Sequence, residues 1–165
     1  MLLVGFLTVI HVVGVALGAG GAFFAEVFYL RAIRDGIIDP TESDFLKTTY
    51  RMLRIGTILL IITGFGLFLY FRLNGRSEFL YNSRYWIKET LLIIILCNAL
   101  LLQARRMPVW LGSAISLASW TAALVVGAWR SIPGTYVEIM LVYLVLVPVT
   151  AWVLEIIRRK MAIRV

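Results

Sequence analysis

The fold of this chain is decided by the stretch His11-Val-Val-Gly-Val-Ala-Leu-Gly-Ala-Gly-Gly-Ala-Phe-Phe-Ala-Glu26. It puts the only histidine, four glycines and a carboxylate into one apolar segment. On a helix, five of its residues fall within about 80° of one another. They are His11, Gly14, Gly18, Gly21 and Ala25. Such a face, an imidazole above a groove of small residues, fits a closely packed helix or a flat ligand.

The composition indicates a polytopic membrane protein. Of the 165 residues, 61% are hydrophobic and 15% are charged, whereas soluble domains have about 45–50% apolar residues. The length fits one helical bundle, so we expect a single domain over residues 1–165. A disulfide within the chain is excluded, because Cys97 is the only cysteine.

Five apolar segments are long enough to cross a bilayer, which takes about 20 residues. The sequence therefore predicts an all-α transmembrane bundle. The expected spans cover about residues 3–30, 50–71, 85–103, 109–129 and 136–157. Asp39, followed by Pro40 and Glu42, resembles a helix start and predicts a lead-in continuous with the second span.

The basic residues predict the orientation of the bundle. Eleven Lys and Arg residues belong to the first loop, the third loop and the C-terminal segment, whereas the opposite loops and helix ends hold five. Positive residues favour the cytoplasmic side, so we expect the N-terminus outside and the C-terminus in the cytoplasm. The net charge of +7 then reflects topology and not nucleic-acid binding. We expect the protein to lie in the lipid bilayer of a bacterial inner membrane.

Ionisable residues within spans are costly and are therefore candidate functional groups. The predicted orientation puts His11 in the outer half of the membrane, about 22 Å along the helix axis from Glu26. Polar side chains of other spans reach the same level as His11. These are Lys88, Glu89 and Glu138, with Arg130 at the rim. The imidazole is a haem or metal ligand, a proton carrier or one partner of an interhelical hydrogen bond.

On the inner side, Arg51 and Arg54 at the start of the second span are candidate partners of Glu26 in an ion pair. Gly14 and Gly18 form a small-xxx-small pattern, which is typical of close helix packing. For this face we expect the complementary residues to be Gly64 and Gly66 of the second span. The face is also a candidate contact with a second copy of the chain or with another membrane protein.

Over about residues 9–106 the sequence resembles a known superfamily. The motifs are His11 followed by Gly20-Gly21-Ala-Phe-Phe, Arg51-Met-Leu-Arg54 before Thr63-Gly64, and Tyr85-Trp-Ile-Lys88. Together they look like the small membrane proteins grouped around the copper-resistance protein CopD and the HemJ-type protoporphyrinogen oxidases. The resemblance implies that His11 is a haem or copper ligand and that Lys88 is the lysine beside that site.

Two departures from the family pattern limit this chemistry. Gly18-Ala19 stands where a tryptophan commonly precedes the Gly-Gly step, and the chain has no second histidine. Ligation of haem by two histidines of one chain is therefore excluded. A five-coordinate haem, a haem shared by two protomers and the absence of a cofactor remain open.

Three functions are compatible with these features. In the first, the glycine face admits haem b, His11 binds the iron, and Lys88 or Arg130 neutralises a propionate. The chemistry would be electron transfer or oxidation. Copper is the weaker alternative, because the sequence has no pair of methionine thioethers of the kind that copper(I) prefers. In the second, His11, Glu89 and Glu138 carry copper or protons across the membrane. The third is a structural or accessory subunit that docks through the glycine face.

Overall fold

The computed structural model describes residues 2–34, 36–129 and 131–162, and within these ranges it contains helices and no strand. The long helices are α1 (Leu2–Ala32), α2 (Pro40–Leu73), α3 (Ser83–Gln103), α4 (Val109–Ala128) and α5 (Tyr136–Ala162). A short 3₁₀ helix, η1 (Ser77–Tyr81), lies between α2 and α3. Each of the five long helices is apolar enough to cross a membrane, which confirms the predicted all-α transmembrane fold.

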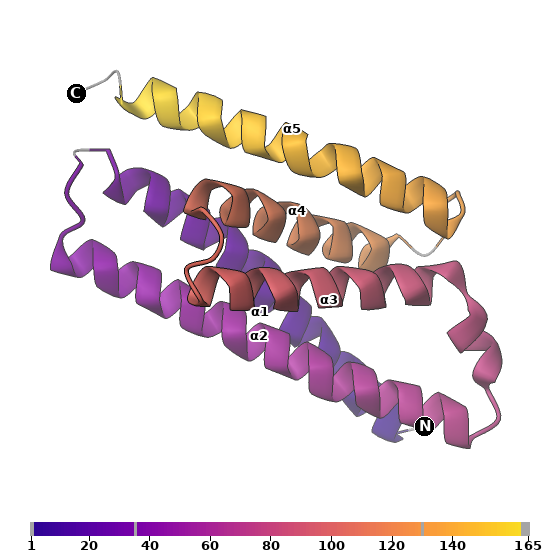
Figure 1. Cartoon of the computed structure of the whole chain (residues 1–165). Helices are drawn as coiled ribbons and strands as arrows, with labels where there is room; N and C mark the ends of the chain where they lie inside the picture. Colours follow the sequence, from indigo (N-terminus) through magenta and orange to yellow (C-terminus); the bar gives the residue numbers. More distant parts are fainter. Residues whose placement is uncertain (1, 35, 130, 163–165) are drawn as a thin grey trace.

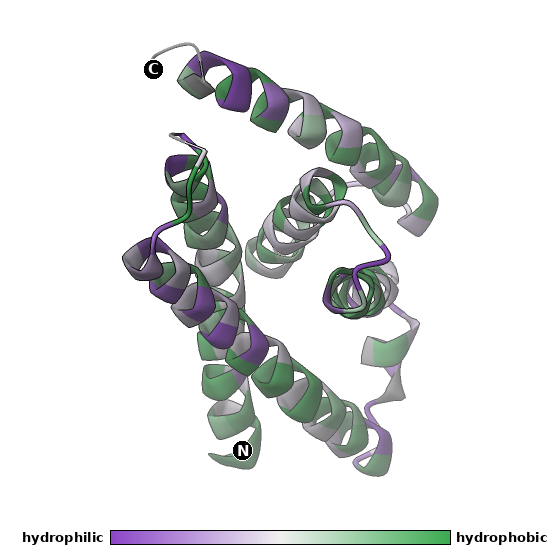
Figure 2. Ribbon diagram, turned by 60° about the vertical axis from the view of Figure 1, so that its left-hand side comes forward, coloured by the Kyte–Doolittle hydropathy of each residue, from purple (hydrophilic) through white to green (hydrophobic). Residues whose placement is uncertain are grey.

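Consecutive helices run in opposite directions (Figure 1). The start of α1 and η1 lie at one end of the bundle, here called the η1 end. The end of α1, the start of α2 and the end of α5 lie at the other, called the Asp39 end. Figure 2 shows hydrophilic residues at the helix ends and connections and hydrophobic residues along the middle of the helices. This distribution fits a bilayer around the middle of the bundle.

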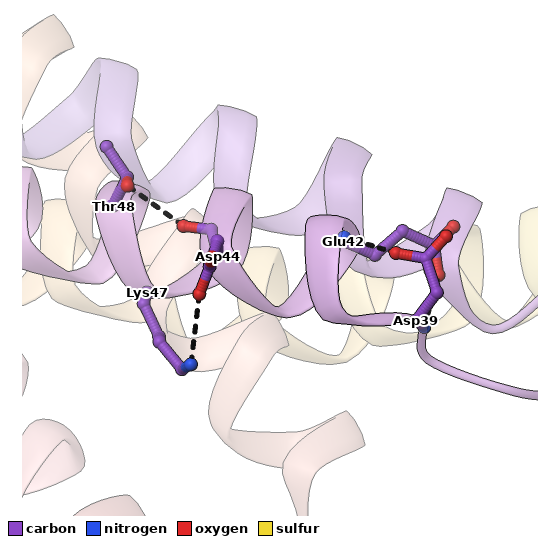
Figure 3. Close-up of polar contacts among 5 residues, drawn as sticks. All are labelled: Asp39, Glu42, Asp44, Lys47 and Thr48. Atoms are coloured by element: carbon purple, nitrogen blue, oxygen red, sulfur yellow. Dashed lines mark hydrogen bonds and ion pairs between the residues drawn. The ribbon is translucent and has the colours of Figure 1, made fainter.

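At the Asp39 end, α2 begins well before its expected membrane span, and its start is fixed by a capping box (Figure 3). The Asp39 side chain accepts a hydrogen bond from the Glu42 backbone N–H at 2.8 Å, and the Glu42 side chain accepts one from the Asp39 N–H at 3.1 Å. Pro40 occupies the first turn, where its missing N–H is not needed. Asp44 adds an ion pair with Lys47 at 3.0 Å. The predicted lead-in to the second span is confirmed.

The most extensive helix contact joins α1 to α2 at crossing glycines. A Cβ added to Gly56 of α2 would lie 2.6 Å from the Gly18 nitrogen and 2.7 Å from the Gly14 carbonyl oxygen of α1. The two backbones therefore touch, and any side chain at Gly56 would push them apart.

The register of the α1–α2 pair is constant along its length. From the η1 end to the Asp39 end the contacts are Leu7 with Gly66, His11 with Thr63, Gly18 with Gly56, Gly21 with Leu53 and Phe28 with Phe45. Each step along α1 is matched, to within one residue, by a step backwards along α2. The glycine crossing thus determines which side chains meet at both ends of the pair.

Trp120 of α4 connects the α1–α2 pair to the rest of the bundle. Its side chain is 1% exposed, and its ring lies so close to Gly18 that a Cβ there would overlap it. It belongs to a core cluster with Ala22, Leu60 and Ile95, which brings together α1, α2, α3 and α4. A second core cluster joins α3, α4 and α5. Its buried members are Ile87, Leu91, Ala118, Val126 and Tyr143.

Three interhelical hydrogen bonds have the same arrangement of groups. In each, a Ser or Thr hydroxyl donates to a backbone carbonyl one turn earlier in its own helix and faces a ring group of another helix. The pairs are Thr63 with His11 Nδ1 at 2.9 Å, Ser119 with the Tyr143 hydroxyl at 2.7 Å, and Thr90 with the Tyr136 hydroxyl at 2.9 Å. Because each hydroxyl has one hydrogen, the ring group is the donor in every pair.

The contact at Gly18 predicts a position-specific loss of stability. Gly18→Ala is expected to destabilise the protein by about 1–3 kcal/mol, because the added methyl overlaps the buried Trp120 ring. Gly20→Ala is the matched control, since a Cβ at Gly20 has nothing within 4 Å; it is expected to be neutral or to stabilise by about 1 kcal/mol. Thermal unfolding of the detergent-purified variants measures both effects. Equal melting temperatures would contradict the packing of Trp120 on Gly18.

Candidate functional site

His11 is half-buried in α1, where its ring faces α2. Nδ1 lies 2.9 Å from Thr63 Oγ1, and the Thr63 hydroxyl donates to the Leu59 carbonyl at 2.6 Å. Thr63 can therefore only accept from the imidazole, so in a neutral ring Nδ1 carries the hydrogen. Nε2 then carries the lone pair and is the atom of His11 that can bind a metal or a further proton.

Lys88 of α3 is close enough to His11 of α1 for a charge–charge interaction between the two side chains. It also interacts with Arg84 and Glu89 of its own helix. Glu89 is half-buried and interacts with Tyr85, one turn earlier in α3. The structure thus brings Lys88 and its neighbours to the same end of the bundle as His11.

Glu138 has a local role at the start of α5. Its Oε2 accepts a hydrogen bond from the Thr135 backbone N–H at 2.7 Å, and its own N–H donates to Thr135 Oγ1 at 3.3 Å. This reciprocal pair is a capping box. The carboxylate expected beside His11 is therefore engaged at its own helix end. Arg130 lies outside the described residues, so its place at the rim stays a prediction.

The glycine face of α1 is covered by the same chain. Gly14 and Gly21 pack on the α2 backbone, and Gly18 packs on both Gly56 and the Trp120 ring. These contacts account for the absence of side chains along the face. A porphyrin or a partner helix at the same place would have to displace Trp120 or separate α1 from α2.

The complementary glycine on α2 is Gly56, whereas Gly64 and Gly66 have other neighbours. A Cβ at Gly64 would lie 4.0 Å from Cε1 of His11, and one at Gly66 would lie 3.4 Å from the Leu7 methyl groups. The expectation that Gly64 and Gly66 match the glycine face is corrected accordingly. Gly64 instead leaves room beside the imidazole.

Glu26 forms a buried ion pair with Arg158 near the Asp39 end. Arg158 Nη2 lies 3.0 Å from Glu26 Oε1, and the two side chains are 14% and 8% exposed. The guanidinium carbon also lies 5.5 Å from the centre of the Tyr29 ring, which adds a cation–π contact. This pair joins the end of α5 to α1.

The ion pair expected between Glu26 and Arg51 or Arg54 is replaced by the pair with Arg158. Both α2 arginines are exposed. The α1–α2 register places Leu53 against Gly21, so Arg54 lies more than one helical turn from the level of Glu26. A local signal for Arg158 does exist in the sequence, because Arg158 directly follows the last residue of the fifth predicted span.

The donor set restricts what His11 can hold. Across residues 2–34, 36–129 and 131–162, no three His, Cys, Asp or Glu side chains come together as a metal site. A bare metal ion commonly needs three or four protein ligands. Haem iron needs as few as one protein ligand, because the porphyrin supplies four nitrogens. The single available imidazole nitrogen therefore fits haem better than a bare copper ion.

Comparison with protein-family models, with curated proteins and with solved structures gives no match for this chain. A functional assignment therefore depends on the chemistry of the site.

Breaking the buried ion pair is expected to cost far more than breaking an exposed one. Arg158→Ala leaves the Glu26 carboxylate buried without its partner and is expected to destabilise by about 3–5 kcal/mol. Lys47→Ala is the control, because its pair with Asp44 has side chains that are 70% and 76% exposed; it is expected to cost at most about 1 kcal/mol. Unfolding of both variants in the same detergent checks the difference. Similar losses would show that the Glu26–Arg158 pair is not buried.

Proposed function

We propose that this integral membrane protein binds haem b, with Nε2 of His11 as the protein ligand of the iron. The observation that carries the proposal is the hydrogen bond from His11 Nδ1 to Thr63. Metal-bound histidines almost always donate their other ring N–H to a fixed acceptor, which sets the tautomer and the ring orientation. Thr63 is such an acceptor. The resemblance to CopD and HemJ proteins implies the same ligand.

The proposed haem lies beside His11, between α2 and α3, and not on the glycine face. Although α2 and α3 are consecutive, their backbones do not pack closely against each other within the described ranges. Phe68 of α2 and Tyr85 of α3 stack with ring centres 6.4 Å apart near this end. Their rings offer apolar surface to a porphyrin, and Lys88 offers a positive charge to a propionate.

Haem bound in this way supplies one-electron transfer chemistry. The role of His11 is to hold the iron, and the role of Thr63 is to keep the imidazole in one orientation. Lys88 offsets the negative charge of the propionates close to the membrane surface. Because the chain has one histidine, it would supply a single imidazole to the iron.

The proposal predicts a specific pattern of haem binding. Detergent-purified protein reconstituted with haem is expected to show a Soret band, and His11→Ala is expected to abolish it. Thr63→Val removes the acceptor for Nδ1 and is expected to weaken haem binding by about 10–100-fold. Thr57→Val is the matched control, because Thr57 is buried on the same helix and its hydroxyl donates to the Leu53 carbonyl. It is expected to retain the wild-type affinity.

Absence of a Soret band from the reconstituted wild-type protein would contradict the proposal, as would an unchanged band in His11→Ala. Equal haem affinities of Thr63→Val and Thr57→Val would contradict the role given to Thr63. Copper-dependent uptake into proteoliposomes that requires His11, in protein without a Soret band, would instead favour a transporter.

A further inference from the structure

A cavity of about 230 Å³ lies between the ends of α1 and α5 at the Asp39 end. Its lining is Leu30, Ile33, Arg34, Arg158, Arg159 and Met161. Three of these side chains carry guanidinium groups and three are apolar. Most of the surface that lines the cavity is apolar, and the three arginines bring guanidinium groups to its edge.

We propose that this cavity binds the phosphate of an anionic phospholipid head group. Guanidinium groups bind phosphate through two parallel hydrogen bonds. Basic pockets between transmembrane helices on the cytoplasmic side bind anionic lipid head groups. The apolar side chains of Leu30, Ile33 and Met161 give the start of an acyl chain a surface to contact, which a free phosphate does not need.

The charges of the two sequence segments that contribute to the cavity favour an anion. Residues 26–35 and 155–160 carry more basic than acidic side chains. The basic ones are Arg31, Arg34, Arg158, Arg159 and Lys160, and the acidic ones are Glu26, Asp35 and Glu155. Glu26 pairs with Arg158, and Glu155 pairs with Arg159 at 2.8 Å. A net positive charge therefore remains at these two helix ends.

One donor of a residue that lines the cavity lacks an acceptor. Nε of Arg158 is buried and has no hydrogen-bond partner among the residues that the structure describes. Its Nη2 is bound to Glu26, so the guanidinium is held in place while Nε remains unsatisfied. A buried charged donor without a partner is costly. A small movement of the Arg158 side chain would let a phosphate oxygen in the cavity accept from Nε.

The cavity lies at a depth that suits a lipid head group. Arg34 and Arg159 are exposed, whereas Leu30 is buried and Arg158 is largely buried. α1 ends at Ala32, so the cavity lies where the apolar span gives way to the polar interface. In the predicted orientation this is the cytoplasmic leaflet.

Native mass spectrometry of delipidated protein titrated with phosphatidylglycerol or phosphatidylcholine tests the proposal. Phosphatidylglycerol is expected to bind about tenfold more tightly, which corresponds to about one charge-assisted hydrogen bond. The double variant Arg34→Ala/Arg159→Ala is expected to lose this preference. The control Arg31→Ala/Lys160→Ala removes the same charge from exposed side chains outside the lining. It is expected to bind phosphatidylglycerol like the wild type.

Equal losses in the two double variants would overturn the proposal, because net charge alone would then explain the binding. Equal affinity for the two lipids would also overturn it. Competition by millimolar inorganic phosphate would assign the cavity to a free anion and not to a lipid. If Arg34→Ala/Arg159→Ala is not recovered folded, Arg159→Ala and Lys160→Ala give the same comparison with one charge removed.

Discussion

The backbone contact between α1 and α2 at Gly56 is the constraint on which the rest of the structure depends. It fixes the register of the two longest helices, so that His11 meets Thr63 towards one end and Phe28 meets Phe45 towards the other. The absence of a side chain at Gly18 also makes room for the Trp120 ring, through which α4 joins the pair. The small residues of α1 thus position the candidate site without belonging to it.

Three hydroxyl groups of the bundle pair with ring groups of other helices, which spares these polar groups an unsatisfied place in the apolar interior of a membrane. A Thr or Ser hydroxyl that donates to its own helix offers a lone pair to a ring donor of the next helix, as at Ser119 and Tyr143. At Thr63 the donor is an imidazole, which has a second nitrogen. The interaction that joins α1 to α2 therefore also leaves the lone pair of a neutral His11 on Nε2.

The five helices and the Asp39 cap could be predicted from sequence, because hydropathy and capping depend on residues close together in the chain. The capping box of Thr135 and Glu138 could have been predicted for the same reason. Glu138 was instead assigned to the polar residues at the level of His11. The partners of Gly18 and Glu26 could not be derived, since they depend on helix register and on the position of α5. Arg158, for example, is 132 residues from Glu26.

The tautomer of His11 tests the hydrogen bond between His11 and Thr63 most directly. It can be measured without ambiguity, because the chain has a single histidine. Nitrogen-15 NMR of the imidazole in haem-free, detergent-solubilised protein gives one pair of ring resonances, measured at an alkaline pH where the ring is neutral. We expect a protonated Nδ1 and an unprotonated Nε2, and loss of this preference in Thr63→Val but not in Thr57→Val. A ring protonated at Nε2, or one that exchanges rapidly between the two tautomers, would contradict the His11–Thr63 contact and the ligand role derived from it.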